Sequence, residues 1–192
     1  MTLVMMRGHV TPLASGGLSD QVHPAVARLH FGSEQLVANG RFNVRRGSSV
    51  AARLACAVMR LPASAHEVGL DLRIEREGKQ EVWRRSFAGR SLDASFERDE
   101  DERLVEGFGP LRLSYQQHAK NGALILNLVA AHLRFGPLSI RLPRWASPRV
   151  RARAWVRVED DLLRACIVVL LPWGKLLLAY RGFLVEVQPW TR

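Results

Sequence analysis

From Val68 onward, apolar and polar residues alternate one by one in segment after segment, and this pattern constrains the fold more than any other feature. Residues 67–77 (EVGLDLRIERE) place an apolar side chain at every second position from Val68 to Ile74, and 109–117, 137–143 and 150–158 repeat the pattern. Such alternation is typical of antiparallel strands with one buried face. Turn-forming sequences separate the runs. We therefore predict a meander of about eight to ten strands.

Two helices are predicted before these strands. In residues 48–62, Ser48 or Ser49 caps a helix that Pro62 ends. The face predicted to pack on the sheet consists of Val50, Leu54, Ala57, Val58 and Leu61. A shorter helix is predicted within 19–32, capped by Ser19 or Asp20, with Pro24 in its first turn.

The predicted fold class is α+β and mainly β. Because a sheet of so many strands tends to curl, we expect a long curved antiparallel sheet, half-barrel or lipocalin-like, packed by one or two N-terminal helices. The 192 residues suit one domain. We expect a flexible lead-in at residues 1–18 and a single domain at 19–192.

The most apolar stretch, 166–187, could be a membrane helix, a buried helix or a pair of strands. A membrane helix needs about 20 apolar residues, but Pro172, Gly174 and Lys175 interrupt this run. We therefore predict two strands joined by a turn, and no transmembrane segment. These strands, like 122–130, are apolar on both faces and need cover on both. A second layer, a membrane surface, a partner or an apolar ligand inside a curved sheet would each supply it.

The charge and the cysteines bear on partners and location. The chain has 28 Lys+Arg against 18 Asp+Glu, a formal net charge of +10. Only three of the cations are lysines, so the arginine bias reflects either genomic base composition or attraction to anionic surfaces. Cys56 and Cys166 each lie in an apolar run and suit buried free thiols. The N-terminus lacks a typical secretory signal. We expect a cytoplasmic protein.

The motifs that mark catalysis, metals or nucleotides do not occur in the sequence. These are Gly-x-Gly-x-x-Gly, His-Glu-x-x-His, Cys-x-x-Cys and Gly-x-Ser-x-Gly. The acidic runs at 97–102 and 159–161 suit exposed strand ends rather than the dry pocket that acid–base chemistry needs. The sequence therefore predicts no cofactor, no metal site and no catalytic residue, and an enzyme is the third of three interpretations.

The first interpretation combines the curved sheet with its excess of apolar faces. The concave face would form an apolar pocket with a few polar groups at its mouth. Trp83, Phe87, Trp155 and Tyr180 are the predicted walls, and Arg85 and Arg181 are predicted to meet an anionic group of the ligand. Together these residues would form one binding site, and they predict a non-enzymatic binding module for an apolar or amphipathic small molecule, such as a lipid-like one. The alternative for each residue is a fully packed core.

The second interpretation uses the arginine-rich strand 149–157. Arg151, Arg153 and Arg157 share a strand face with Trp155. Such a face suits an interaction module for a protein or a membrane surface. A single-stranded nucleic acid, bound by stacking and phosphate contacts, is the less favoured partner. The alternative is a solvated strand face whose arginine stems cover apolar neighbours.

Several segments also resemble a known family. They are VWRRSFAGR (82–90), GFGPLRLSY (107–115), PLSIRLPRWASP (137–148) and LPWGKLLLAYRGFLVEV (171–187). In this order they resemble a bacterial domain of unknown function that occurs alone or behind saccharopine-dehydrogenase-like NAD(P)-binding domains. The resemblance covers Val26 to Gln188. The resemblance implies no established activity, and it implies an NAD(P)-binding domain as a partner. This sequence has no dinucleotide fingerprint, so we do not expect that companion domain within it.

Overall fold

The computed structural model describes residues 17–190, so the lead-in predicted at 1–18 lies almost entirely outside the described residues. The elements are η1 (Ser19–Gln21), α1 (Pro24–Phe31), β1 (Leu36–Arg46), α2 (Val50–Val58), β2 (Ala65–Glu77), β3 (Gln80–Phe87), β4 (Arg90–Ser91), β5 (Ala94–Arg98), β6 (Leu104–Phe108), β7 (Leu111–Lys120), β8 (Ala123–Phe135), β9 (Leu138–Arg141), β10 (Arg149–Val156), β11 (Leu163–Leu170) and β12 (Leu176–Pro189).

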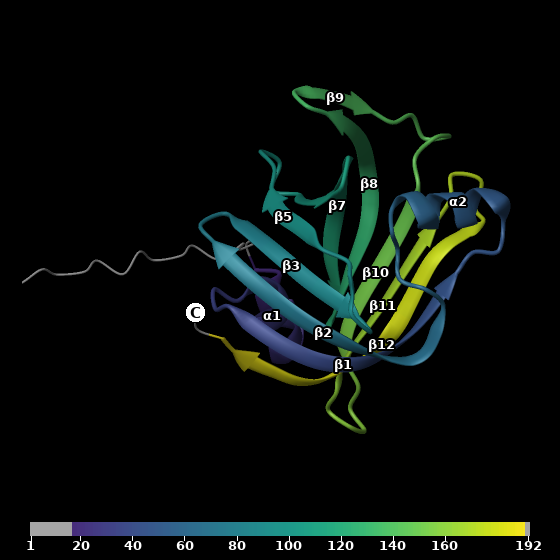
Figure 1. Cartoon of the computed structure of the whole chain (residues 1–192). Helices are drawn as coiled ribbons and strands as arrows, with labels where there is room; N and C mark the ends of the chain where they lie inside the picture. The colour runs from purple at the N-terminus through teal and green to yellow at the C-terminus, as the bar shows by residue number, and fades with distance from the viewer. Residues whose placement is uncertain (1–16, 191–192) are drawn as a thin grey trace, which may run out of the picture.

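Ten antiparallel strands close into a barrel (Figure 1). The strand order is β10-β11-β12-β1-β2-β3-β5-β6-β7-β8, and β8 pairs with β10 to close the ring. The short strands β4 and β9 pair with β3 and β8 outside it. The structure therefore confirms the predicted α+β, mainly β fold with a curved antiparallel sheet, and it shows the closed form of that sheet.

The alternation in the sequence corresponds to the inside and outside of the barrel. On β2, Leu70, Leu72 and Ile74 are buried while the residues between them are exposed or half-buried. On β10 the apolar residues likewise face inward and the arginines outward. The prediction is wrong for β9, where Leu138 and Ile140 are exposed, because β9 pairs only with the end of β8 and has no core beneath it.

The apolar stretch at 166–187 forms the hairpin β11–β12, as predicted. Its turn is closed by hydrogen bonds from the Leu171 amide to the Lys175 carbonyl and from the Gly174 amide to the Leu171 carbonyl, both 2.8 Å. Gly174 has a positive φ of 84°, which a glycine adopts without strain. No helix within residues 17–190 is long and apolar enough to span a membrane.

α1 lies across one end of the barrel. Its cap is His23, whose Nδ1 accepts a hydrogen bond from the Ala25 amide at 3.3 Å. The predicted caps Ser19 and Asp20 are therefore wrong, because these residues belong to the separate turn η1. The apolar side chains of α1 are buried at this end: Val26, Leu29 and Phe31.

α2 lies at the opposite end, and its buried face differs from the predicted one. Ser49 caps it as predicted, with its Oγ accepting from the Ala52 amide at 3.2 Å. The residues that pack inward are Ala52 and Cys56, while Val50, Leu54 and Val58 are 74%, 65% and 75% exposed. The small side chains let the helix approach β12 closely, with Cys56 Sγ 3.6 Å from the Leu177 carbonyl oxygen. The helix ends at Val58 rather than at Pro62.

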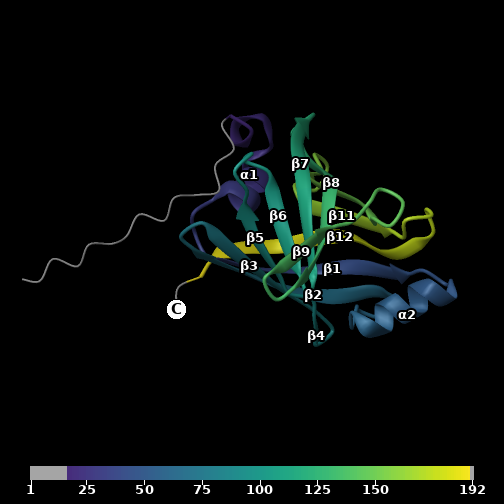
Figure 2. The same cartoon turned by 90° about the horizontal axis from the view of Figure 1, so that it is seen from above.

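Because all ring strands are antiparallel, their connections alternate between the two ends of the barrel. The α1 end comprises 17–35, 78–79, 99–103, 121–122 and 157–162. The α2 end comprises 47–64, 88–93, 109–110, 136–148 and 171–175. Figure 2 shows the two helices on opposite sides of the strands.

Candidate functional site: the barrel interior

The interior of the barrel holds a partly open cavity of about 210 Å³. Its walls are mainly the inward-facing aliphatic and aromatic side chains of the ring strands, including Leu72, Phe96, Leu113, Ile167 and Leu184. Leu29 and His30 of α1 line it at one end, and Met59 and Leu61, which follow α2, line it at the other. The cavity therefore extends along the barrel between the two ends.

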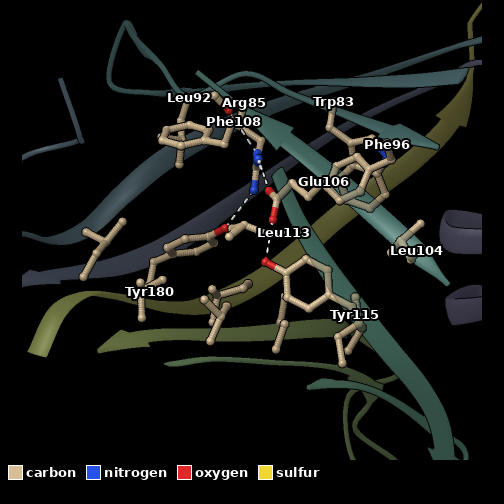
Figure 3. Close-up of a pocket in the computed structure, with 18 of the residues that line it drawn as sticks. Trp83, Arg85, Leu92, Phe96, Leu104, Glu106, Phe108, Leu113, Tyr115 and Tyr180 are labelled. Carbon is tan, nitrogen blue, oxygen red and sulfur yellow. Dashed lines mark hydrogen bonds and ion pairs between the residues drawn. The ribbon is translucent and has the colours of Figure 1, made fainter. Parts of the chain in front are cut away.

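A cluster of four polar side chains projects into this apolar space (Figure 3). Arg85 on β3 donates from Nη1 to the Tyr180 hydroxyl at 2.8 Å and from Nε to the Leu92 carbonyl at 3.0 Å. Its Nη2 lies 3.5 Å from Oε1 of Glu106 on β6. The Tyr115 hydroxyl donates to the other Glu106 oxygen at 2.7 Å.

The protonation states of this cluster follow from burial and from its charges. Burial raises the pKa of Tyr115 well above its usual range, and the Glu106 carboxylate raises it further. Burial also raises the pKa of Tyr180, although Arg85 opposes this shift. Burial alone would lower the pKa of Arg85, but the oxygens of Tyr180 and Glu106 leave it raised. Both phenols are therefore neutral at physiological pH and Arg85 is a cation.

The cluster retains hydrogen-bonding capacity on the cavity side. A guanidinium has five N–H groups, and the bonds of Arg85 to Leu92, Tyr180 and Glu106 engage three of them. Because the Tyr180 oxygen accepts from Arg85, its own proton can be donated to a ligand. The cluster thus presents donors to the cavity while the cation remains compensated by Glu106.

A second polar group lies where α1 meets the cavity. Arg76 pairs with Glu81 at 3.0 Å, and both side chains are buried. Nη2 of Arg76 donates to the Leu29 carbonyl of α1 at 2.6 Å, and the other Glu81 oxygen accepts from Trp83 Nε1 at 2.9 Å. The His30 ring lies 5.1 Å from the Trp83 ring. Burial and the nearby Arg76 lower the pKa of His30 to about 3, so His30 is neutral.

Three of the predicted ligand-binding residues line the cavity, namely Trp83, Arg85 and Tyr180. Phe87 is buried beside them rather than among the lining residues. Its ring centroid lies 5.4 Å from that of Tyr180 and 6.1 Å from that of Phe42, so it packs against two residues that line the cavity.

The other two predicted residues lie on the outside of the barrel. Trp155 and Arg181 are not among the lining residues, and Arg181 is exposed. The register places Arg181 opposite Cys166, and Cys166 opposite Arg153, along one outward row. The prediction assumed that these aromatic and basic residues face inward, whereas their position in the alternation directs them outward.

Most lining residues were not predicted as site residues, and among them are the polar side chains of His30, Glu81, Glu106 and Tyr115. The alternation at 109–117 already places Tyr115 on the same strand face as Leu113, and both are buried in β7. Glu106 lies between Leu104 and Phe108 at spacing two, and all three line the cavity. An acidic residue at an inward position of a strand was therefore the available signal.

The arginines of strand 149–157 face solvent. Arg151, Arg153 and Arg157 are exposed, and Arg153 stacks over Trp155 at 4.9 Å from the ring centroid. Arg157 pairs with Glu159 at 2.9 Å. The register places Arg151 opposite Val168 and Arg153 opposite Cys166 on this outer face, where the side chains of β11 are half-buried.

The fold and the cavity define this chain as a closed antiparallel barrel with a polar cluster inside an apolar interior, an architecture compatible with a binding module. A family model described as "Domain of unknown function (DUF4166)" matches residues 22–184, so the chain belongs to that family. The match agrees with the resemblance seen in the sequence to a domain of unknown function. No curated protein matches the sequence.

Proposed function

We propose that this domain binds a small, largely apolar molecule inside the barrel, with one polar end of that molecule directed at Arg85 and Tyr180. The observation that supports this most directly is the cavity of about 210 Å³, whose apolar walls surround a few convergent polar groups. That combination is the usual form of a ligand site. A core built only for stability would be filled with side chains rather than leave a space of this size.

The volume limits the size of the ligand. A dry protein cavity of about 150 Å³ holds a molecule of benzene. A space of 210 Å³ suits a somewhat larger compact molecule or one short acyl chain, and it is too small for a whole phospholipid. The proposed ligand class is therefore a small apolar or amphipathic molecule.

The charge balance of the cluster favours a neutral polar end. Arg85 already has its counterion in Glu106. In this low-dielectric space an anionic ligand would be attracted by Arg85 and repelled by Glu106. A carbonyl or hydroxyl group can accept from Arg85 or Tyr180 without that repulsion. An anionic ligand would bind well only by displacing Glu106.

Two fluorescent probes test the proposal: neutral N-phenyl-1-naphthylamine and anionic 1-anilinonaphthalene-8-sulfonate. We expect the neutral probe to bind the wild-type chain. The variant Ala165→Phe projects a ring into the cavity from β11, and we expect it to weaken binding of this probe at least tenfold. The matched control is Val168→Phe, on the same strand but opposite exposed Arg151 on the outer face. Equal binding by both variants would contradict the proposal.

The stability of Ala165→Phe separates a cavity from a packed core. A phenyl ring that enters empty space costs little, whereas overpacking a filled core costs about 1–3 kcal/mol. We expect the urea midpoint of this variant to stay near that of the wild type. Native mass spectrometry of protein purified from cells then shows whether a small molecule of apolar character co-purifies.

The polar end is tested at Arg85 and Glu106. The ligand for this test is 1-naphthol, a neutral naphthalene that carries a hydroxyl group. We expect Arg85→Met to weaken binding of 1-naphthol about tenfold or more, because a hydrogen bond to a charged group is worth about 1.5–3 kcal/mol. Arg84→Met is the control, since Arg84 is the next residue and faces solvent beside Glu75. Glu106→Gln should strengthen binding of the anionic probe by leaving Arg85 uncompensated. Unchanged anionic binding would remove the assigned role of Glu106.

A second candidate function uses the arginine-rich strand as an interaction surface. Arg151 and Arg153 are exposed, and among residues 17–190 neither forms an ion pair. This supports an anionic protein or membrane partner on the barrel wall. If this face alone carries vesicle binding, Arg151→Glu combined with Arg153→Glu abolishes binding to anionic vesicles, and unchanged binding excludes this face.

We also propose the biological setting that the resemblance implies, a bacterial cytoplasm with a saccharopine-dehydrogenase-like NAD(P)-binding domain as partner. Two observations support a reducing compartment: Cys56 and Cys166 are both free thiols, and Cys56 is buried. A pull-down of the full chain against the separately expressed NAD(P)-binding domain tests the partner. Failure to associate in the presence and absence of NADP would contradict it.

A further inference from the structure

We propose that the α2 end of the barrel docks on an anionic lipid bilayer. The proposed surface, which we call the docking rim, consists of three segments: 48–60, 134–149 and 171–175. In Figure 1, α2, β9 and the β11–β12 turn lie along the upper side of the molecule. Apart from Arg149, at the start of β10, this surface is separate from the outward arginines of that strand, Arg151 and Arg153. It does not depend on what the cavity binds.

The docking rim carries most of the large apolar side chains that the barrel exposes. Of the eleven large hydrophobic residues exposed in the described part of the chain, eight are in these three segments. They are Val50, Leu54, Val58, Phe135, Leu138, Ile140, Trp145 and Trp173. Trp145 is 80% exposed and Trp173 is 60% exposed. Exposed apolar groups gathered in this way mark an interaction site.

All charged residues in these three segments are basic. They contain seven arginines and lysines and no Asp or Glu. The cations are Arg53, Arg60, Arg134, Arg141, Arg144, Arg149 and Lys175. All seven are exposed, and within residues 17–190 none forms an ion pair. The positive charge is therefore uncompensated by the protein and available to an anionic partner.

The combination identifies the partner as a bilayer. α2 presents Val50, Leu54 and Val58 one turn apart beside Arg53, which is the form of a helix that lies in a membrane interface. The other two segments carry Trp145 and Trp173. Tryptophan suits the membrane interface because its ring is apolar and its N–H can bond to the lipid head groups. Exposed aliphatic side chains would gain nothing from a nucleic acid, whose backbone contacts are polar and ionic.

The opposite end of the barrel makes docking directional. The connections of the α1 end contain nine acidic residues and four basic ones. An anionic membrane therefore attracts the α2 end and repels the α1 end. Met59 and Pro148, which line the cavity, belong to the docking rim, so a docked barrel would have its cavity facing the bilayer. This last consequence rests on the proposed cavity function, whereas docking itself does not.

Co-sedimentation of the full chain with vesicles tests the proposal. We expect binding to phosphatidylcholine vesicles that contain 30% phosphatidylglycerol, weaker binding in high salt and little binding to phosphatidylcholine alone. Arg141→Glu with Arg144→Glu should reduce the partition coefficient at least tenfold, since each cation near an anionic surface contributes about a factor of five. Trp145→Ala with Trp173→Ala should reduce it about as much.

Two control variants make the outcome decisive. Arg151→Glu with Arg153→Glu reverses the same number of charges on the barrel wall and should leave at least half of the binding. Ala165→Phe fills the cavity and should leave all of it. All the rim positions changed are exposed, so the thermal midpoint by circular dichroism should not move. The proposal is overturned if only the wall variant loses binding, or if a single-stranded oligonucleotide competes with vesicles and the tryptophan variant binds normally.

Discussion

The two ends of the barrel each carry one short helix, yet the helices use their apolar residues in opposite ways. α1 buries its large side chains and joins the cavity wall through Leu29. α2 buries only Ala52 and Cys56 and exposes its larger residues to solvent. One helix therefore completes the core, and the other is attached to the barrel by its small side chains.

The electrostatic contrast follows the same division. At the α1 end, cations are paired with acids, as in Arg28–Glu34, Arg103–Asp101 and the buried pair Arg76–Glu81. At the docking rim the cations have no such partners among the described residues. The comparison suggests that the α1 end contributes mainly to stability and that the α2 end is available for binding. Four predictions test this division.

The largest difference should appear when Arg76 and Arg53 are each replaced by alanine. Arg76→Ala leaves Glu81 buried without its cation and removes the bond to the Leu29 carbonyl. We expect a loss of about 3–5 kcal/mol in the free energy of unfolding. Arg53 of α2 is exposed, and Arg53→Ala should change stability by less than about 0.5 kcal/mol. Urea unfolding followed by tryptophan fluorescence measures both, and equal losses would contradict the division.

A smaller contrast is expected between two leucines. Leu29 of α1 is 3% exposed, whereas Leu54 of α2 is 65% exposed. Truncation of a buried leucine costs about 2–5 kcal/mol, so Leu29→Ala should be clearly destabilising. Leu54→Ala should be nearly neutral in the same urea titration. A loss above about 1 kcal/mol for Leu54→Ala would show that α2 packs on something that its exposure does not indicate.

The α1 end should also make stability depend on pH through His30. Its pKa is lowered to about 3 in the folded state and is near 6.5 in the unfolded chain. Below pH 6.5 the unfolded state takes up a proton that the folded state does not. Stability from this group is therefore complete above pH 6.5 and is lost as the pH falls toward 3, by up to about 1.4 kcal/mol per pH unit.

The variant His30→Gln isolates this effect. The charged groups around His30 are Arg76 and its partner Glu81, and both remain in the variant. We expect the urea midpoint of His30→Gln to fall less between pH 6.5 and 5 than that of the wild type. His118→Gln is the control, because His118 is exposed and should leave the pH dependence unchanged. Identical slopes for all three proteins would remove His30 as the cause.

The barrel was predictable from sequence because alternation is a local property. Leu70, Leu72 and Ile74 reveal their common face without any knowledge of the other strands. The turn between β11 and β12 was also predictable from local sequence, because Pro172 and Gly174 interrupt the apolar stretch. The pairing of β8 with β10, which closes the barrel, could not be predicted in this way. The sequence of a strand does not show which distant strand it pairs with.

The site was predicted only in part for a related reason. Trp83, Arg85 and Tyr180 were chosen for their residue types and do line the cavity, but Trp155 and Arg181 were chosen on the same grounds and face outward. Residue type shows what a side chain can do, whereas strand parity decides where it lies. For α2 the larger side chains defined the expected core face, but close helix–sheet approach favoured the small ones.

The smallest change in stability should come from loss of the helix cap at Ser49. This change compares the local stability of α2 directly with that of α1. Ser49→Ala removes the hydrogen bond from the Ala52 amide, worth about 1 kcal/mol. Because only Ala52 and Cys56 anchor α2, this loss should open the helix locally while the barrel stays folded. We expect faster amide exchange confined to 50–58 by hydrogen–deuterium exchange mass spectrometry. His23→Ala removes the corresponding cap of α1, yet the buried side chains of that helix should hold its exchange near the wild-type rate. Equal acceleration in both helices would mean that burial, the property by which the two ends differ, does not govern their local stability.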